Sequence, residues 1–352
     1  MLRARHLGWS LISSALFLAA CADSSELGDQ ELAFGGGAGG GGGGCPEWGC
    51  TGNSPTIGPY ELHELDLDRA PNFEGVAIQG VQLNGVPVEV HFKGGDRIYV
   101  TDQNGNVTEG AGLDGLRFFL SSPTDRFHLV IQKVTPQASS PTRYWIGDPD
   151  RIETYELGFA YENHPNELRP VCRNPPAAET APGGIQWPNR FEAILFTGDR
   201  YDGKKKLVTA SSYEESRNWF NIACAGSVLA KMHLNKKTTA GSDSTHQSHR
   251  EERQALLKMY TGDFCGEGFA FTEPGTPLHW ADSQGWRKFD GNEIGFEAWW
   301  DAKGARCLTE HRLGTTYYNA VMASCHLDPC KGNPFPDEWD EGAFLKSAIP
   351  SP

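Results

Sequence analysis

The sequence predicts a mixed fold in which an all-β domain, a sandwich or a barrel, precedes a disulfide-rich α+β domain with two helices. Three observations support this prediction. Short runs of alternating apolar residues, separated by turn signals, fill the first half of the chain. Two runs with helical spacing follow them, and eight cysteines come after a first one at position 21. The 352 residues are enough to build two compact cores.

Residues 1–20 have the pattern of a signal peptide, with Arg3 and Arg5 ahead of an apolar stretch. The next residues, Leu18-Ala19-Ala20-Cys21, resemble the lipobox of bacterial lipoproteins, in which the cysteine is acylated and becomes the new N-terminus. We therefore expect Cys21 to carry a lipid anchor, with an ordinary signal peptide and a chance cysteine as the alternative. Position 22 is Ala rather than the Asp that resembles an inner-membrane retention signal. The expected location is thus the outer membrane, on its periplasmic or its cell-surface face.

Residues 21–56 are expected to form a flexible tether, because the unbroken run from Gly39 to Gly44 has no side chains with which to bury apolar surface. A phosphate-binding loop is not indicated, since no strand precedes these glycines and no helix follows them.

The β-rich domain is expected over residues 57–165. Asn84-Gly85 suits a type I′ turn between the runs 81–83 and 86–92, and Val86, Val88 and Val90 would share one face of the second strand. Five further strands are expected in the same style, at Arg97–Thr101, Leu116–Leu120, Phe127–Val134, Arg143–Ile146 and Thr154–Phe159. Short strands in this number are typical of a sandwich or a barrel.

The α+β domain is expected over residues 166–330, followed by a C-terminal tail at 331–352. The Pro- and Gly-rich stretch 163–188 marks the boundary before it. A hairpin is expected from 190–196 and 207–209, and helices are expected at Asn221–Leu234 and Arg250–Tyr260, where apolar residues recur at helical spacing.

The eight cysteines other than Cys21 are predicted to form four disulfides, because an exported chain with an even number of thiols normally oxidises them. Spacing suggests the pairs Cys45–Cys50, Cys325–Cys330, Cys172–Cys224 and Cys265–Cys307. A zinc site is the competing interpretation, but the chain contains no Cys-x-x-Cys pair.

The stretch Gly262-Asp263-Phe264-Cys265-Gly266, placed after the second expected helix, resembles the ADYC domain of bacterial lipoproteins, named for an Ala-Asp-Tyr-Cys motif before Gly. Asp263 and Cys265 match that motif, whereas Gly262 and Phe264 replace its Ala and Tyr. The resemblance covers about 170–307 and implies no activity and no catalytic residue, because the function of the family is unknown. As structure, Gly262 suits a helix C-cap, and Asp263 suits a turn in which it accepts backbone N–H bonds.

One polar loop contains histidine, aspartate and serine residues of the types that bind metals or form catalytic triads. His246 and His249 have a spacing that brings two imidazoles to one helix face, with Asp243 nearby, but a third firm metal ligand is missing and no metal is assigned. Ser242, Asp243 and His246 have the residue types of a catalytic triad, yet they are too close in sequence for its geometry, and no Gly-x-Ser-x-Gly elbow occurs.

The remaining candidates are acids and tryptophans. Carboxylates such as Asp290, Glu293 and Glu297 are expected on the solvated surface of so acidic a chain. Four tryptophans are expected to fill a small core, with a glycan-binding surface as the alternative; they are Trp280, Trp286, Trp299 and Trp300.

The predicted function is that of a cell-envelope lipoprotein that binds or scaffolds a glycan or a protein without catalysing a reaction and without a cofactor. A formal charge of −14 disfavours nucleic acid as a partner, because it repels phosphates. The alternative is an envelope hydrolase acting on glycan or peptide through acidic residues of the second domain, and a purely structural envelope component is the third option. The oligomeric state is not readable from the sequence.

Overall fold

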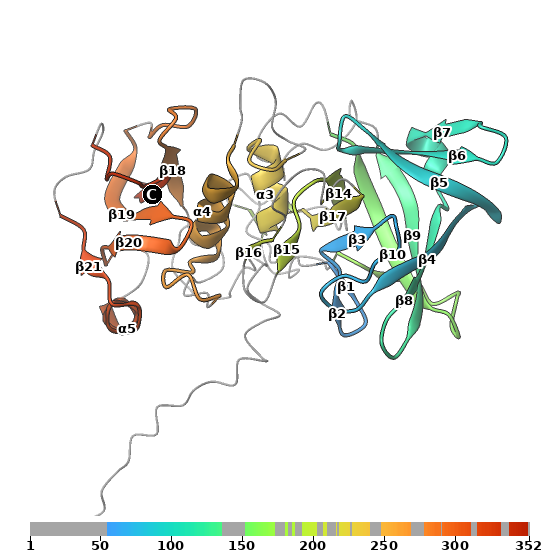
Figure 1. The fold of residues 1–352 in the computed structure, drawn as a ribbon, viewed down its shortest axis with the longest axis horizontal. Coiled ribbons are helices and arrows are strands. Elements are labelled where there is room, and N and C mark those ends of the chain that lie inside the picture. Colours follow the sequence, from blue (N-terminus) through green and yellow to red (C-terminus); the bar gives the residue numbers. More distant parts are fainter. Residues whose placement is uncertain are drawn as a thin grey trace, which may run out of the picture.

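The computed structural model describes residues 55–135, 152–172, 180–181, 185–186, 192–202, 207–209, 216, 218–225, 227–239, 248–268, 278–289, 291–310, 315–331 and 338–350. In these residues a large antiparallel sheet and a smaller sheet lie at opposite ends of the molecule, with two helices between them (Figure 1). The mixed fold class, rich in antiparallel sheet, is confirmed.

The large sheet has 11 strands, and each pair of neighbouring strands in it is antiparallel. Its strands, in spatial order, are β3 (Glu64–Asp66), β17 (Trp219–Cys224), β14 (Glu192–Thr197), β10 (Thr154–Tyr161), β9 (Arg126–Thr135), β8 (Arg117–Ser121), β4 (Ala77–Leu83), β5 (Val86–Lys93), β6 (Arg97–Asp102) and β7 (Val107–Glu109), with β11 (Arg169–Pro170) on β10. The predicted hairpin is confirmed in β4 and β5, where Asn84 and Gly85 both have positive φ, as a type I′ turn requires.

The large sheet curls so that its far strands approach each other. The tip of the β5–β6 hairpin reaches β14, where the Thr197 N–H donates to the Gly95 carbonyl at 2.7 Å. The Ile98 N–H donates to the Tyr155 hydroxyl of β10 at 3.1 Å. The curled sheet thereby encloses one apolar core, in which aromatic and aliphatic side chains of nearly every strand are buried.

Strands β14 and β17 separate this core from a second one, and every residue of both strands is buried. On β14, Ile194 and Phe196 pack into the second core, whereas Leu195 packs into the first. On β17, Ala223 packs into the second core and Ile222 packs into the first. The expected boundary near residue 165 therefore does not coincide with an edge of the sheet, because strands placed in the second domain complete the sheet of the first.

The helix α3 (Val228–Leu234) packs against β17, and the helix α4 (Arg250–Thr261) packs on α3. The helix α4 (Arg250–Thr261) is found where it was predicted. The other predicted helix was too long, since α3 (Val228–Leu234) begins only after the N-cap Ser227, whose side chain accepts from Ala230 N. Residues 221–224, expected in that helix, belong to β17, because both faces of this strand are apolar and its sequence has no alternation to reveal it.

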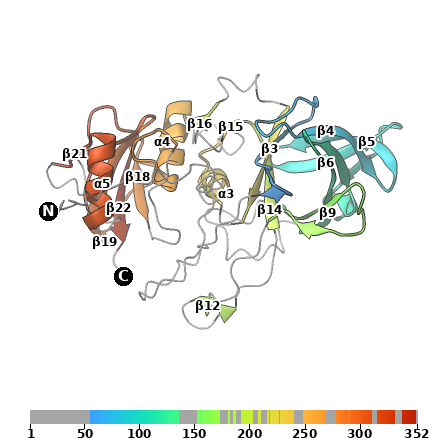
Figure 2. The same cartoon turned by 90° about the horizontal axis from the view of Figure 1, so that it is seen from below.

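The small sheet packs against the other side of α4. Its strands, in spatial order, are β18 (His279–Asp282), β22 (Leu345–Pro350), β19 (Glu293–Asp301), β20 (Gly304–Leu308) and β21 (Asp328–Pro329). The helix α5 (Thr315–Cys325) lies along this sheet (Figure 2). Residues 331–352, expected as a tail, supply β22, which lies between β18 and β19. Shorter elements are β1 (Thr56–Ile57) with β2 (Tyr60–Glu61), the 3-10 turn Gly110–Leu113, β12 (Thr180–Ala181) with β13 (Ile185–Gln186), and β15 (Tyr201–Asp202) with β16 (Leu207–Val208). The hairpin predicted from 190–196 and 207–209 was wrong, because β16 pairs with β15, whereas β14 pairs with β10 and β17 in the large sheet.

Three disulfides are present in the described residues. The predicted Cys172–Cys224 pair is confirmed and joins the segment after β11 to the end of β17. The predicted pairs Cys265–Cys307 and Cys325–Cys330 were wrong, since Cys265 bonds to Cys325 and Cys307 bonds to Cys330. The reason is topological: Cys325 ends α5 beneath the exit of α4, whereas Cys330 follows β21, which pairs with β20.

Other predictions fall outside the described residues. These are the signal peptide, Cys21, the tether, Cys45, Cys50, the strand at 143–146, Ser242, Asp243, His246 and Asp290. Within the part that is described, no helix is both long and apolar enough to cross a membrane.

Candidate functional site

The exit of α4 holds the sequence motif in a tight turn. Gly262 is the C-cap, with φ of 66° in the left-handed region, and its N–H bonds to carbonyls of the last helical turn. Gly266 and Gly268 also have positive φ, at 74° and 95°. The predicted C-cap role of Gly262 is confirmed, and the chain reverses here through conformations that residues other than glycine adopt at a cost.

Asp263 organises this turn from within the protein. Its Oδ2 accepts from the Lys258 ammonium and, at 2.8 Å, from the Gly268 N–H, so the expected backbone contact is confirmed. Lys258 also donates to the Gly266 carbonyl at 3.0 Å. Both Asp263 and Lys258 are fully buried, so water does not screen the pair.

The rest of the motif packs the turn onto the β19–β20 hairpin. The Phe264 ring lies 5.1 Å from that of Trp300, and Ala305 N–H donates to the Phe264 carbonyl at 3.0 Å. A Cβ on Gly266 would lie 1.5 Å from the Lys303 carbonyl oxygen, so only glycine fits there. The Cys265–Cys325 disulfide links the same turn to the end of α5. The motif is therefore a structural connection between α4, α5 and the small sheet.

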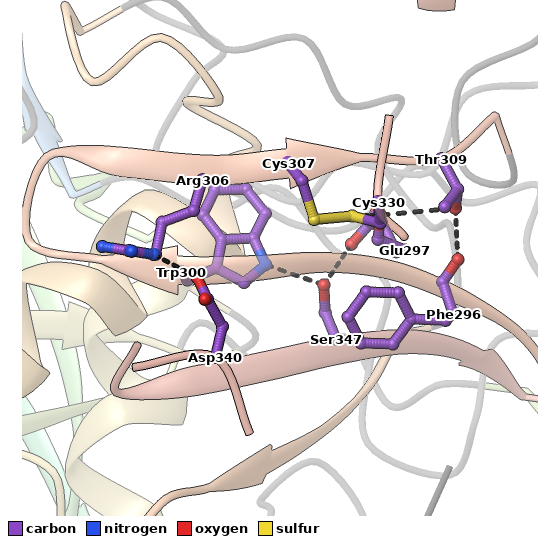
Figure 3. The surroundings of a disulfide bond; sticks show 9 residues. All are labelled: Phe296, Glu297, Trp300, Arg306, Cys307, Thr309, Cys330, Asp340 and Ser347. Carbon is purple, nitrogen blue, oxygen red and sulfur yellow. Dashed lines mark hydrogen bonds and ion pairs between the residues drawn. A yellow bond between two sulfur atoms is a disulfide. The ribbon is translucent and has the colours of Figure 1, made fainter. Parts of the chain in front are cut away.

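A series of hydrogen-bonded polar side chains crosses the small sheet next to the Cys307–Cys330 disulfide (Figure 3). Trp300 Nε1 donates to Ser347 Oγ at 2.7 Å, and this hydroxyl donates to a Glu297 carboxylate oxygen at 2.6 Å. Glu297 is completely buried because its β19 position faces the core, and the Glu293 side chain is 2% exposed and lies 3.1 Å from His279 Nδ1. The expectation of a solvated carboxylate was therefore wrong for both residues. Trp280, Trp299 and Trp300 are buried, which confirms the core interpretation for them, whereas Trp286 is 49% exposed.

 An open groove crosses the outer face of the large sheet over β4, β8 and β9, with a volume of about 610 Å³ that includes space open to solvent. Gly80, Phe119 and His128 are neighbours across the three strands and line the groove. A Cβ built on Gly80 would meet no atom within 4 Å, so the groove is hollow at this position.

An aromatic pair forms one side of this hollow. The Phe119 and His128 rings meet edge to face with centroids 4.8 Å apart, and both point away from the core that Phe118 and Phe127 enter. Burial and the nearby Arg117 lower the pKa of His128, which keeps the imidazole neutral. Among the described residues, His128 Nδ1 is buried without a hydrogen-bond partner.

Polar side chains stand at the rim of the groove. Gln79 and Gln82 come from β4, and Gln79 donates to Ser121 Oγ at 2.7 Å. Arg126 and Glu162 stand on the β9 side of the groove, across β8 from Gln79, with 4.0 Å between Nε and Oε2. An aromatic ring, neutral amides and one balanced ion pair can bind a polar ligand by stacking and by hydrogen bonds.

Comparison with known proteins agrees with the motif at the exit of α4. The family model of the ADYC domain matches residues 110–314, more than half of the chain. The chain belongs to the ADYC domain family. Neither the curated proteins nor the solved structures gave a significant match.

The ADYC domain is larger than the motif suggested. The resemblance was expected to cover about 170–307, but the match begins at residue 110 and includes β8, β9 and β10 of the large sheet. Part of the β-rich domain expected over 57–165 therefore lies within the family domain. Two of the three strands under the groove, β8 and β9, lie within the matched residues.

A second pocket of this ADYC protein lies beside β3 and has a volume of about 310 Å³. Four carboxylates are among the residues that line it: Glu61, Glu64, Glu74 and Asp202. Burial raises the pKa of Glu64, and Arg200 opposes this shift by donating to both carboxylate oxygens, at 2.8 and 3.2 Å. The Arg200 guanidinium is itself packed between the rings of Phe73 and Trp219, at 4.8 and 3.5 Å from their centroids. Because Arg200 engages both oxygens, Glu64 acts as a structural anion.

The other predicted site residues are not brought together by the described structure. His249 is an exposed N-cap residue of α4 without a side-chain cap bond, and its suggested partners lie outside the described residues. Across the described ranges, no group of three or more His, Cys, Asp and Glu side chains is placed to hold a metal ion. The groove was missed by the sequence analysis, because its side chains come from separate strands and share no local pattern.

Proposed function

We propose that this ADYC protein is a lipoprotein of the bacterial cell envelope, anchored through Cys21, that binds a ligand without transforming it. The three disulfides indicate an oxidising compartment outside the cytoplasm. The pattern Leu18-Ala19-Ala20-Cys21 supports the anchor, since acyl chains on one cysteine hold a protein to a membrane without a spanning helix.

The groove over β4, β8 and β9 is the observation that carries the binding role. It is open along the sheet face and presents an aromatic ring beside amide and charged side chains. Such a surface offers contact area and hydrogen bonds to a ligand without enclosing it. A hydrolase would instead need carboxylates free to act across a cleft, and the acid-rich pocket engages Glu64 with Arg200.

The anchor is tested by cell fractionation of the full chain and by intact mass. We expect the parent protein in the outer-membrane fraction with acyl chains on Cys21, and a Cys21→Ser variant that is not acylated and leaves the membrane fraction. Ala22→Asp is the matched control, because it keeps the lipidated cysteine and is expected to move the protein to the inner membrane. A parent protein with an unmodified Cys21 would refute the anchored part of the proposal.

A further inference from the structure

We propose that the groove over β4, β8 and β9 binds an uncharged glycan chain, with Phe119 as the stacking platform. This inference rests on the proposed binding function and names the class of its ligand. Three properties of the groove support it: its place on a fully paired sheet, its hollow beside an aromatic ring, and its balanced charge.

The groove lies on interior strands. β4 pairs with β5 and β8, β8 with β4 and β9, and β9 with β8 and β10. An extended peptide binds a sheet chiefly by adding a strand to a free edge, where unpaired N–H and C=O groups are available. Here the sheet offers side chains only, so the ligand must be recognised by its faces and substituents. A sugar ring suits this mode, since it has an apolar C–H face and hydroxyls around its rim.

The hollow has the form that a sugar ring requires. Gly80 has no side chain, and the Phe119 ring stands beside it on the next strand. Aromatic side chains provide large contact area with little loss of conformational freedom. The T-shaped contact with His128 fixes the Phe119 ring in place before a ligand arrives.

The charge of the groove selects against ionic ligands. Among the residues that line the groove, the charges of Arg126 and Glu162 oppose each other, and burial together with Arg117 beside the lining lowers the pKa of His128 and keeps it neutral. The whole chain carries a formal charge of −14, which repels acidic polymers. Gln79 and Gln82 add amides that both donate and accept hydrogen bonds, as neutral hydroxyl or acetamido groups require.

The test uses the full acylated chain in a detergent without a sugar headgroup. The probes are neutral hexasaccharides of glucose, mannose, galactose and N-acetylglucosamine, with an uncharged decapeptide of Gly, Ser, Asn and Gln as the competing class. Saturation-transfer NMR detects binding, and calorimetric titration gives the affinity. The key variant is Gly80→Ile, because a Cβ at this position meets no atom within 4 Å and the added side chain projects into the hollow.

We expect at least one hexasaccharide to bind the parent protein, Gly80→Ile and Phe119→Ala each to weaken that affinity by roughly tenfold or more, and thermal stability of Gly80→Ile to be kept. Glu89→Ile is the matched control, since it adds the same side chain to exposed sheet surface outside the groove, and it should bind as the parent does.

The inference is overturned if no hexasaccharide binds at millimolar concentration, if Gly80→Ile binds as well as the parent, or if only the peptide binds. These results are separate from those on the anchor. Fractionation and mass report on Cys21, whereas titration reports on the groove, so either part of the proposal can fail while the other stands.

Discussion

Lys258 and Asp263 form an ion pair that is closed to water, at the point where α4 ends and the family motif begins. The pair links the last turn of the helix to the loop that packs on the small sheet. A buried ion pair carries a large desolvation cost, so it stabilises the fold only while both partners are present.

Replacing Asp263 with Ala should therefore destabilise the protein strongly. The substitution leaves the Lys258 ammonium buried without its carboxylate and removes the acceptor of the Gly268 N–H. We expect the free energy of unfolding to fall by roughly 3–5 kcal/mol in urea titrations. Glu267→Ala, an exposed carboxylate in the same turn, is the control and should change stability by less than about 0.5 kcal/mol. Equal effects of the two substitutions would contradict a structural role for the pair.

Gly266→Ala tests the close approach of the motif to the β19–β20 hairpin. Two costs combine there: a positive φ of 74° and a Cβ that would overlap the Lys303 carbonyl oxygen. Gly291→Ala isolates the first cost, since Gly291 has φ of 87° and open space around its added Cβ. We expect about 1–2 kcal/mol for Gly291→Ala and a clearly larger loss for Gly266→Ala, measured by the same urea titrations. Similar losses would mean that the hairpin moves aside readily.

Local signals in the sequence were enough for some elements. Asn84-Gly85 predicts its hairpin because only a few residues adopt two successive positive φ values, and α4 has both a regular apolar period and a glycine at its end. The role of Gly262 and Asp263 in the turn followed from the same kind of local rule. These features depend on a few consecutive residues, so no tertiary contact is needed to predict them.

Features that depend on distant contacts were not predictable in this way. β17 is buried on both faces, so its apolar residues fit a helical period as well as a strand. Cys325 and Cys330 are close in sequence, yet α5 and β21 carry them to different partners. The groove joins residues of three strands, and the exposed hollow at Gly80 exists only once those strands are paired. Pairing of strands and of cysteines is fixed by the whole fold rather than by spacing.

The disulfide connectivity predicts the products of digestion without reduction. Peptides that contain Cys265 and Cys325 should be joined, as should those that contain Cys307 and Cys330. Replacing both Cys172 and Cys224 with Ala should lower the free energy of unfolding by roughly 2–5 kcal/mol, since that bond closes a long loop across the first core. A peptide joining Cys265 to Cys307 would contradict the structure and restore the pairing suggested by spacing.

Buried tyrosines should make the fold sensitive to alkali. Burial raises the pKa of Tyr260 to about 12, and it raises the pKa values of Tyr155 and Tyr201 well above 10. An unfolded tyrosine loses its proton near pH 10, so above that pH the unfolded state binds fewer protons than the native state. The stability from each neutral buried tyrosine is thus fully present below pH 10 and is lost as the pH rises toward its folded pKa.

For Tyr260 alone, this loss amounts to roughly 1 kcal/mol between pH 9 and pH 11. Tyr260→Phe should reduce the fall in unfolding free energy over that interval by the same amount, because phenylalanine has no proton to lose. The variant also loses the bond from Trp280 Nε1 at 3.0 Å, so its stability at neutral pH will be lower. The comparison is therefore between the two pH dependences, measured by urea titration at pH 7, 9, 10 and 11. An unchanged slope in Tyr260→Phe would show that this phenol ionises in the folded protein as readily as in the unfolded chain.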